Sequence, residues 1–389
     1  MLGRGKQAIT GADVKGKRRV IRAAGMMSGT SLDGVDLAVI ETDGVDVFSF
    51  AEVGYRSYTD AERGVLRAAL GKWPGEEGVA EAAAIVEDAH IDLASGLEGV
   101  ELLGFHGQTL AHDPKGHRTH QAGDGARVAE ALGINTVWDF RSADVALGGQ
   151  GAPLAPFYHW ACARWVGLFR PAVFLNIGGV GNLTWINTKE VAPDLFGALL
   201  AFDTGPGNAP MDDLMMRRGL GRHDEGGALA AKGTPDANVL EAFIETAYFD
   251  APPPKSLDRS DFSALTDAVA DLSTQDALAT LAECITGAVA MGFAHLPSVP
   301  SALYVTGGGR HNKHLMDQLT ELLPCPVASV EALGLDGDKL EAQAFAYLAT
   351  RIAGKLPTSA PGTTGVGASV SGGTISRVTA SDAPLKLSK

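Results

Sequence analysis

The sequence predicts an α/β protein built from two similar domains with a cleft between them. The chain has 389 residues, which is more than one hydrophobic core usually serves, so two cores are expected. Residues 20–40 and 172–186 each combine an apolar strand, a turn of small residues and a returning strand, and helices and further strands follow both. Because each half needs its own buried sheet, this repetition indicates a duplicated α/β domain.

Each expected strand or helix is predicted from the spacing of apolar residues along the chain. In the first half we expect strands at 20–27, 35–40, 45–50 and 102–105, and helices at 60–70, 76–97 and 124–132. In the second half we expect strands at 172–177, 182–186 and 302–306, and helices at 273–295, 312–323 and 338–353. The predicted organisation is a disordered extension at 1–19, domains at 20–150 and 151–356, and a flexible tail at 357–389. The tail is rich in Gly, Ser, Thr and Pro, which bury too little apolar area to order it.

Composition disfavours several classes of protein. A net charge of −14 argues against a nucleic-acid binder, since phosphate binding needs clustered Lys and Arg. The apolar runs are shorter than the roughly 20 residues that span a bilayer, so we expect no membrane partner and a cytoplasmic location. Three widely spaced cysteines match neither a disulfide framework nor a zinc site. His112, His117 and His120 lie in a polar turn and are not read as metal ligands.

Three glycine-rich turns could hold phosphate. Residues 28–34, Ser-Gly-Thr-Ser-Leu-Asp-Gly, form the first hairpin tip, where main-chain amides can surround an anion and Asp33 could orient Mg²⁺. Residues 178–181 form the second tip, and Gly307–Gly309 directly follow a strand. Each is also consistent with an ordinary polar turn or a tight strand-to-helix connection. A Walker-type Gly-x-x-x-x-Gly-Lys-Ser/Thr loop does not occur in the sequence.

One carboxylate has the placement of a catalytic base. Asp203 ends an apolar strand within Phe-Asp-Thr-Gly-Pro-Gly-Asn, residues 202–208, just before a helix. A carboxylate fixed there can take a proton from water or a hydroxyl, and the helix N-terminus favours a nearby anion. The alternative is that Asp203 only caps the turn, which would not explain the surrounding glycines.

Several polar side chains could bind a polyol in the cleft. His106, Gln108, Asp139 and Arg141 lie at or just past predicted strand ends. The run Gly148 to Pro153 follows them. Glu341 lies on the predicted helix 338–353 and could be either a ligand residue or an exposed helical glutamate. Each of the others could equally belong to a local turn or ion pair.

Together these motifs resemble the anhydro-N-acetylmuramic acid kinases. The matching stretches, including Met-Ser-Gly-Thr-Ser-Leu-Asp-Gly-Val-Asp and Asn-Ile-Gly-Gly-Val-Gly-Asn, are residues 27–36, 105–109, 139–154, 176–182, 202–208 and 306–309. They occur in order from about residue 24 to residue 353. The basic N-terminal extension and the polar tail depart from the family pattern without removing a motif.

The resemblance implies an actin-like, two-domain ATPase fold with the active site between the domains. It implies a cell-wall recycling enzyme that uses ATP and Mg²⁺ to open 1,6-anhydro-N-acetylmuramic acid with water and phosphorylate O6, a small-molecule substrate, and a possible homodimer. Asp203 would be the base and Asp33 a metal ligand. The ATP site would comprise Gly29, Thr30, Ser31, Leu32, Asp33, Gly34, Val35, Asp36, Gly178, Gly179, Gly307, Gly308 and Gly309. The sugar site would comprise His106, Gln108, Asp139, Arg141, Gly205 and Glu341.

Two other classes of function stay open at this point. The same fold accepts many substrates, so the acceptor could be another sugar or a small carboxylic acid. The chain could also be a non-enzymatic nucleotide switch, either a filament-forming actin relative or a sugar-sensing regulator. A regulator should carry a basic helix-turn-helix, and none is visible in the sequence.

Overall fold

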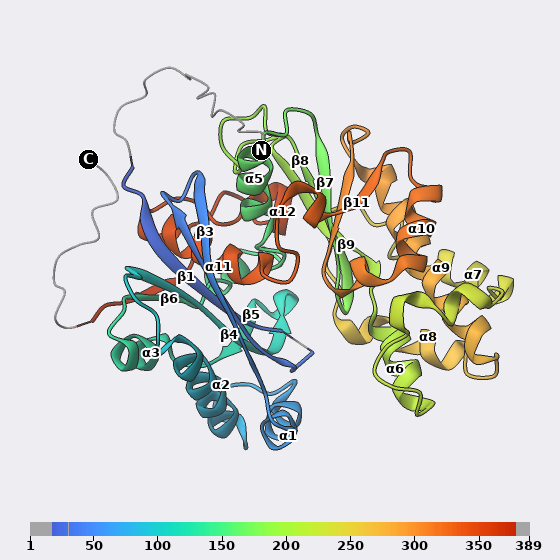
Figure 1. Ribbon diagram of the computed structural model, residues 1–389, viewed down its shortest axis with the longest axis horizontal. Helices are drawn as coiled ribbons and strands as arrows, with labels where there is room; N and C mark the ends of the chain where they lie inside the picture. The colour runs from blue at the N-terminus through green and yellow to red at the C-terminus, as the bar shows by residue number, and fades with distance from the viewer. Residues whose placement is uncertain (1–17, 30, 379–389) are drawn as a thin grey trace, which may run out of the picture.

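The computed structural model describes residues 18–29 and 31–378 and consists of two lobes, each built on one mixed sheet (Figure 1). The first sheet contains β1 Ile21–Ser28, β2 Gly34–Thr42, β3 Val47–Ser57, β4 Leu102–Asp113, β5 Arg118–Ala122, β6 Thr136–Trp138 and β12 Thr374–Ser376. The second contains β7 Ala172–Ile177, β8 Val180–Ile186, β9 Leu199–Pro206, β10 Leu303–Thr306 and β11 Val327–Ser329. The predicted extension at 1–19 lies outside the described residues, apart from its last two positions.

Five strands of the first sheet have the same topology as the five strands of the second. In the first, the order is β3-β2-β1-β4-β6, with antiparallel pairing from β3 to β1 and parallel pairing from β1 to β6. In the second, β9-β8-β7-β10-β11 repeats that order and those directions. The predicted duplicated, actin-like α/β fold is therefore confirmed, and the hairpins β1–β2 and β7–β8 are corresponding parts of the two halves.

Helices cover both faces of each sheet. The first sheet packs on one face against α1 Asp60–Ala69, α2 Val79–Ala94 and α3 Gly125–Leu132, and on the other against α11 Leu340–Ala353. On one face the second sheet packs against α9 Thr274–Gly292 and α10 Lys313–Leu322, with α6 Ala209–Arg217, α7 Ala237–Ile244 and α8 Ser263–Ala268 beside them. The remaining helices are α4 Ser142–Ala146, α5 Pro156–Trp165 and α12 Pro361–Thr364. The other face of the second sheet contacts two of these, α5 and α12. Alternate β1 residues enter different cores, as the two-residue period of a strand requires.

Glycines in the first sheet let α11 lie close to it. A Cβ on Gly25 would fall 2.0 Å from the carbonyl oxygen of Ala342, and a Cβ on Gly104 would fall 2.2 Å from that of Phe345. The close approach brings the first turn of α11, which carries Glu341, to the edge of the interdomain space.

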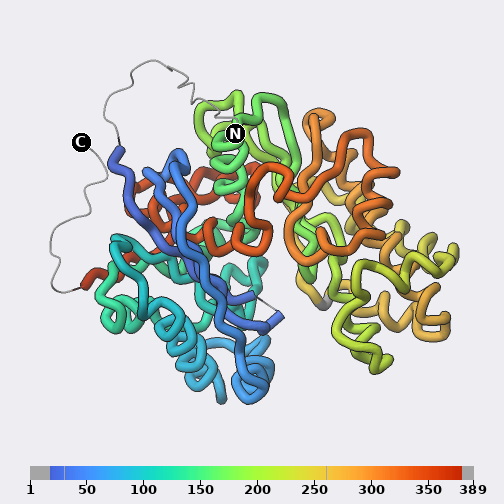
Figure 2. The backbone as a smooth tube through the Cα atoms, in the orientation of Figure 1, coloured from blue at the N-terminus to red at the C-terminus, as the bar shows by residue number. Residues whose placement is uncertain are grey.

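The predicted domain limits need two corrections. The predicted second domain, residues 151–356, includes α11, but this helix packs on β1, β2 and β4 of the first sheet. The predicted flexible tail is ordered over residues 357–378, where β12 pairs with β6 (Figure 2). Hydroxyl groups of this segment contribute, because Ser359 and Thr364 both donate hydrogen bonds at 2.5 Å to the buried carboxylate of Asp144. Residues 379–389 lie outside the described part.

Helix α9, with the short turn that follows it, has the length and apolarity of a membrane span. Of its most apolar stretch within residues 274–295, 67% is buried inside the protein. The buried side chains, among them Leu278, Leu281 and Ile285, form the centre of the second core. Packing against the second sheet therefore accounts for this composition.

Candidate active site

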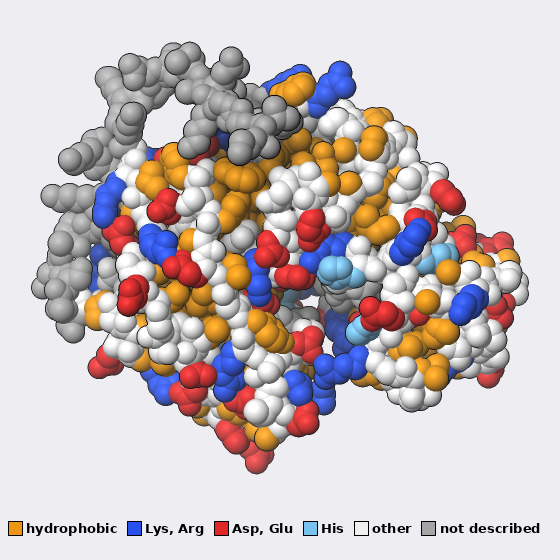
Figure 3. All heavy atoms as spheres, viewed as in Figure 1, with side chains coloured by type: hydrophobic (Ala, Val, Ile, Leu, Met, Phe, Trp, Pro, Cys, Tyr) orange, Lys and Arg blue, Asp and Glu red, His pale blue; other side chains and the backbone are white. Residues whose placement is uncertain are grey.

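The two hairpin tips face each other across a cleft. A cavity of about 510 Å³ is lined by Gly29, Ser31 and Asp33 from the first half and by Gly178, Gly179 and Gly308 from the second. A smaller cavity of about 200 Å³ adjoins it and contains Asp203. The two share seven lining residues, which are Met27, Arg141, Ala152, Asn176, Val180, Asn182 and Glu341. Figure 3 shows the hollow between the lobes, with acidic and basic side chains at its rim.

Asp203 is a buried carboxylate in the smaller cavity. Strand β9 places it opposite Asn182 of β8, and its Oδ2 accepts a hydrogen bond of 2.8 Å from the main-chain N–H of Leu257. Burial raises the pKa of Asp203 from 3.8 to about 7, although the Leu257 hydrogen bond opposes the rise. Such a carboxyl group can bind and release a proton near neutral pH, which a general base requires.

Arg141 presents a positive charge to both cavities. Its Nε donates to Nε2 of His106 at 3.1 Å, and its Nη1 donates to the carbonyl oxygen of Gly151 at 2.7 Å. Burial and the nearby guanidinium hold the pKa of His106 well below its usual value, so the imidazole is neutral and accepts from Arg141. Neither of these two described partners is an anion. Arg141 is therefore suited to bind an anionic ligand group.

Glu341 enters the same space from the start of α11. Its carboxylate accepts a hydrogen bond of 3.4 Å from Nδ2 of Asn176, which lies on β7. The side chain is open to the cleft, but the surrounding walls desolvate it and raise its pKa. The negative charge of Asp36 adds to that rise, and Arg141 opposes it. Asp203, Arg141 and Glu341 therefore come from three different elements and meet in one cavity.

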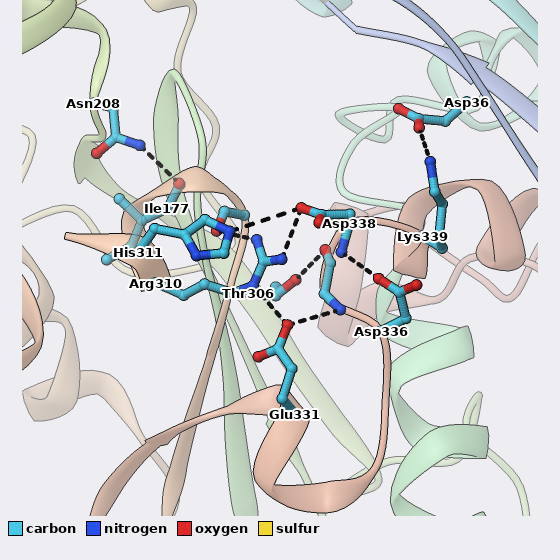
Figure 4. Close-up of polar contacts among 12 residues, drawn as sticks. Asp36, Ile177, Asn208, Thr306, Arg310, His311, Glu331, Asp336, Asp338 and Lys339 are labelled. Atoms are coloured by element: carbon cyan, nitrogen blue, oxygen red, sulfur yellow. Dashed lines mark hydrogen bonds and ion pairs between the residues drawn. The ribbon is translucent and has the colours of Figure 1, made fainter. Parts of the chain in front are cut away.

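The triple glycine is fixed to the segment that leads into α11. Arg310 donates from Nη1 to the Gly307 carbonyl oxygen at 2.8 Å and forms ion pairs with Glu331 at 2.8 Å and Asp338 at 2.7 Å (Figure 4). Lys339 then pairs with Asp36 of β2 at 2.5 Å. This chain of contacts connects the glycine turn of the second half to the first sheet.

Helix α6 begins at the cleft without a side-chain cap, and because Pro210 has no N–H, its first amides are those of Ala209 and Met211. Asn208 occupies the N-cap position, but its side chain donates to the Ile177 carbonyl oxygen at 3.2 Å instead of capping the helix. Asn208 and Gly308 both line the cleft and a further cavity of about 340 Å³ beside it. Uncapped amides at a helix N-terminus favour an anion such as phosphate.

Several predicted site residues lie outside the cavity walls. Gln108 is buried and accepts a hydrogen bond of 2.5 Å from Ser28, Asp139 accepts one from Ser142, and Gly205 faces α9, where a Cβ would fall 2.7 Å from Ala288. Asp36 is engaged by Lys339. The structure therefore gives these four residues supporting positions. Thr30 lies outside the described residues.

Other residues of the predicted ATP site pack beneath the glycine turns. The side chains of Leu32 and Val35 pack in the core under the first tip, and Gly34 lies against Arg56, whose carbonyl oxygen would be 2.3 Å from a Cβ. Gly309 is packed on the Ile177 side chain. Asp33 does reach the cleft and lies 3.7 Å from Arg222 of the other lobe.

The sequence reasoning missed residues on two elements. Asp212 of α6 lines the cleft, and burial raises its pKa to about 6. Leu257, Asp258 and Arg259 also line it. The signal for this loop was present in the chain as Pro-Pro-Pro-Lys-Ser-Leu-Asp-Arg, residues 252–259. A proline cluster followed by charged residues is unusual between helices and marks a constrained loop.

Two solved structures are distant matches. A ROK family glucokinase from Streptomyces griseus in complex with glucose and AMPPNP covers 85% of this chain and 99% of its own, at 13% identity and a TM-score of 0.42. The activator of the 2-hydroxyisocaproyl-CoA dehydratase from Clostridium difficile covers 86% and 96%, at 10% identity and a TM-score of 0.43. Similarity this weak adds no support, and the fold rests on the two matching sheets.

Curated relatives are far more similar. Anhydro-N-acetylmuramic acid kinase 1 of Jannaschia sp. (strain CCS1) is 60% identical over 90% of this chain and 94% of its own. The anhydro-N-acetylmuramic acid kinase of Cereibacter sphaeroides is also 60% identical, over 93% and 97%, and that of Caulobacter vibrioides is 47% identical over 91% and 98%. The family model described as anhydro-N-acetylmuramic acid kinase matches residues 21–377. The chain therefore belongs to the anhydro-N-acetylmuramic acid kinase family.

Proposed function

We propose that this chain hydrolyses the 1,6-anhydro bridge of 1,6-anhydro-N-acetylmuramic acid and transfers the γ-phosphoryl group of ATP to O6, giving N-acetylmuramic acid 6-phosphate and ADP. This reaction would return a cell-wall fragment to amino sugar metabolism. The observation that carries the proposal is the position of Asp203, a buried carboxylate without a cation partner among the described residues. It faces a cavity that continues into the glycine-lined cleft.

Asp203 would act as the base. Its ionised carboxylate takes one proton from a water molecule as the oxygen of that water bonds to the anomeric carbon. The bond between the anomeric carbon and O6 breaks, and O6 bonds to the γ-phosphorus as ADP leaves. A pKa of about 7 leaves enough of the ionised form at neutral pH while keeping the carboxylate basic enough to take the proton.

The residues around the cleft fit a nucleotide phosphate chain. ATP would supply the phosphoryl group, and Mg²⁺ would neutralise the charge that develops on its oxygens. Gly178, Gly179 and Gly308 leave room for phosphate at the cleft wall, and the amides at the start of α6 would stabilise its charge. Mg²⁺ commonly binds through one or two carboxylates plus phosphate. Asp33 and Asp212 both line the cleft and would fill that role.

Arg141 would bind the lactyl carboxylate of the sugar. That carboxylate is the only charged group of the proposed acceptor, and neither of the described hydrogen-bond partners of Arg141 is an anion. A paired Arg and carboxylate in a partly enclosed site gives both affinity and orientation. Glu341 and Asn176, on the same wall, would accept and donate hydrogen bonds to the sugar hydroxyl and acetamido groups.

A labelling experiment tests the proposal. Protein, ATP, Mg²⁺ and the anhydrosugar are incubated in oxygen-18 water, and the product is quenched early and analysed by mass spectrometry. We expect one label at the anomeric oxygen and none in the transferred phosphate. Unlabelled product kept in the same water for the same time corrects for exchange. Label in free phosphate without sugar phosphate would indicate simple ATP hydrolysis and would contradict the proposal.

A further inference from the structure

A hydrogen bond joins the glycine loop of residues 148–153 to the proline-rich loop of residues 252–259. The hydroxyl group of Ser256 donates to Oε1 of Gln150 at 2.7 Å. Neither residue lines the two cavities that hold the proposed reaction. The bond therefore connects two loops behind the active site.

Hydrogen bonds fix the main chain of Gln150. Its main-chain N–H donates to the Thr364 carbonyl oxygen at 2.7 Å, and its carbonyl oxygen lies 2.9 Å from Nε2 of His112. The next amide, that of Gly151, donates to Oδ1 of the buried Asp144 at 2.7 Å. The Gln150 side chain thus extends from a loop whose main chain is already fixed.

Ser256 lies between two residues that hold Asp203. The main-chain N–H of Asp203 donates to the Lys255 carbonyl oxygen at 3.0 Å. The N–H of Leu257 donates to Oδ2 of Asp203 at 2.8 Å. Residues 255–257 therefore hold both the main chain and the carboxylate of Asp203, and the Ser256 hydroxyl points the other way, toward Gln150.

We propose that Gln150 and Ser256 are positioning residues, whose hydrogen bond holds the 255–257 segment so that the Leu257 amide stays on the carboxylate of Asp203. The inference rests on the proposed role of Asp203 as base. The main chain of Gln150 is fixed to His112 of β4 and to Thr364 of α12, so its side chain gives the 255–257 segment a fixed point. Losing the hydrogen bond would release the Leu257 amide.

The consequence is a change in the proton affinity of Asp203. Leu257 stabilises the ionised carboxylate, so losing that donor favours the protonated form and raises the pKa. Other titratable groups face Asp203 or its cavity, and they are Tyr248, Lys255, His159, Arg141 and Glu341. Burial keeps Tyr248 and His159 neutral. None of these five groups contacts Ser256 or Gln150 through a described hydrogen bond, so removing the Ser256 hydroxyl leaves their contacts in place.

The test compares the pH dependence of kcat/KM for wild type, Ser256→Ala and Ser256→Thr. We expect the acid limb of Ser256→Ala to move up by about one pH unit, the equivalent of one hydrogen bond to a charged group. At a pH about two units below the wild-type midpoint, kcat/KM would fall about tenfold, with a smaller loss at pH 9. Ser256→Thr keeps the hydroxyl and should keep the wild-type limb.

A double variant separates this role from a general loss of structure. Gln150→Met removes the acceptor at similar size, and Gln150→Met/Ser256→Ala should shift the limb no further than either single change. An unmoved limb, or an equal loss at every pH, would overturn the proposal. Asp203→Asn separates failure of the proposed base from failure of the positioning role. If this variant retains near wild-type turnover, the proposed base is wrong. If it is inactive but the acid limb of Ser256→Ala is unmoved, only the positioning role is wrong.

Discussion

Two carboxylates, one on the first hairpin and one on the strand beside the second hairpin, differ in their partners. Asp36 lies on β2, one pair below the first tip, and Lys339 reaches it at 2.5 Å. In the second half the corresponding position of β8 is Asn182, and Asp203 faces it from β9. Burial raises the pKa of both acids, but among the described residues only Asp36 has a cation partner. The paired charge therefore supports the structure, and the unpaired one is available for reaction.

The largest expected effect is on Asp203. Asp203→Asn should lower kcat by at least about 100-fold, because general base catalysis contributes factors of that size. Steady-state ADP release measures the loss, and circular dichroism of the variant should match the wild type. A variant that turns over at near the wild-type rate would remove Asp203 from the mechanism.

The same substitution should change stability in the opposite direction. The pKa of folded Asp203, about 7, lies above the ordinary 3.8, so ionisation of this buried group destabilises the fold. The unfolding free energy of the wild type should therefore fall relative to Asp203→Asn as the pH rises from about 4 to about 7. The upper bound of the difference is about 4 kcal/mol. Urea unfolding at pH 5 and pH 8 should show about 3 kcal/mol of it, and a difference independent of pH would contradict the assignment.

The glycine turn of the second half gives the next effect in size. Gly307 has a φ of 73°, and a Cβ there would fall 2.2 Å from Oδ1 of Asn176. Gly307→Ala should destabilise the protein by about 2–3 kcal/mol, since both strain and overlap arise. Gly334→Ala is the matched control, with a φ of 74° and no heavy atom within 4 Å. It should lose only about 1 kcal/mol, and equal losses would show that overlap is unimportant.

The strands and turns that carry the site could be predicted, because short sequence patterns indicate them. Both hairpins and the strand that carries Asp203 were recognisable from apolar runs and glycine. The expected end of that strand at Asp203 was wrong, because β9 continues to Pro206. The directions of the His106 and Gln108 side chains could not be predicted. Residues two apart on a strand are expected to face the same side. Gly107, with a φ of 72°, and a register shift between β1 and β4 turn Gln108 toward Ser28 instead.

Contacts between residues far apart in the sequence could not be predicted. The composition of residues 357–378 predicts flexibility, yet hydroxyl groups there bond to Asp144, more than 200 residues earlier. Lys339 likewise reaches Asp36 across 303 positions. Such pairs depend on which elements the fold brings together, and no local pattern records them.

The next effect in size concerns Asp36, the acid that is paired with Lys339. Lys339→Met removes the cation from Asp36 while keeping most of the side-chain length, and leaves a carboxylate that burial already disfavours. We expect a loss of about 1–2 kcal/mol in unfolding free energy at pH 7, below the value for fully buried pairs because Asp36 is partly exposed. Denaturation of Lys339→Met/Asp36→Asn, which removes both charges, should recover most of the loss. No recovery would show that the ion pair is not the cause.

The smallest effect should come from the glycine of the first tip. A Cβ on Gly29 would meet nothing closer than 3.8 Å, so Gly29→Ala should change the unfolding free energy by less than about 0.5 kcal/mol. Gly29 lines the cleft, and a phosphate close to its main chain would still be obstructed. We therefore expect the KM for ATP to rise about threefold at unchanged Tm, since close approach of an anion to the main chain favours glycine. An unchanged KM would place the phosphates on the second-half glycines alone, and the two tips would then differ in function as well as in the partners of their acids.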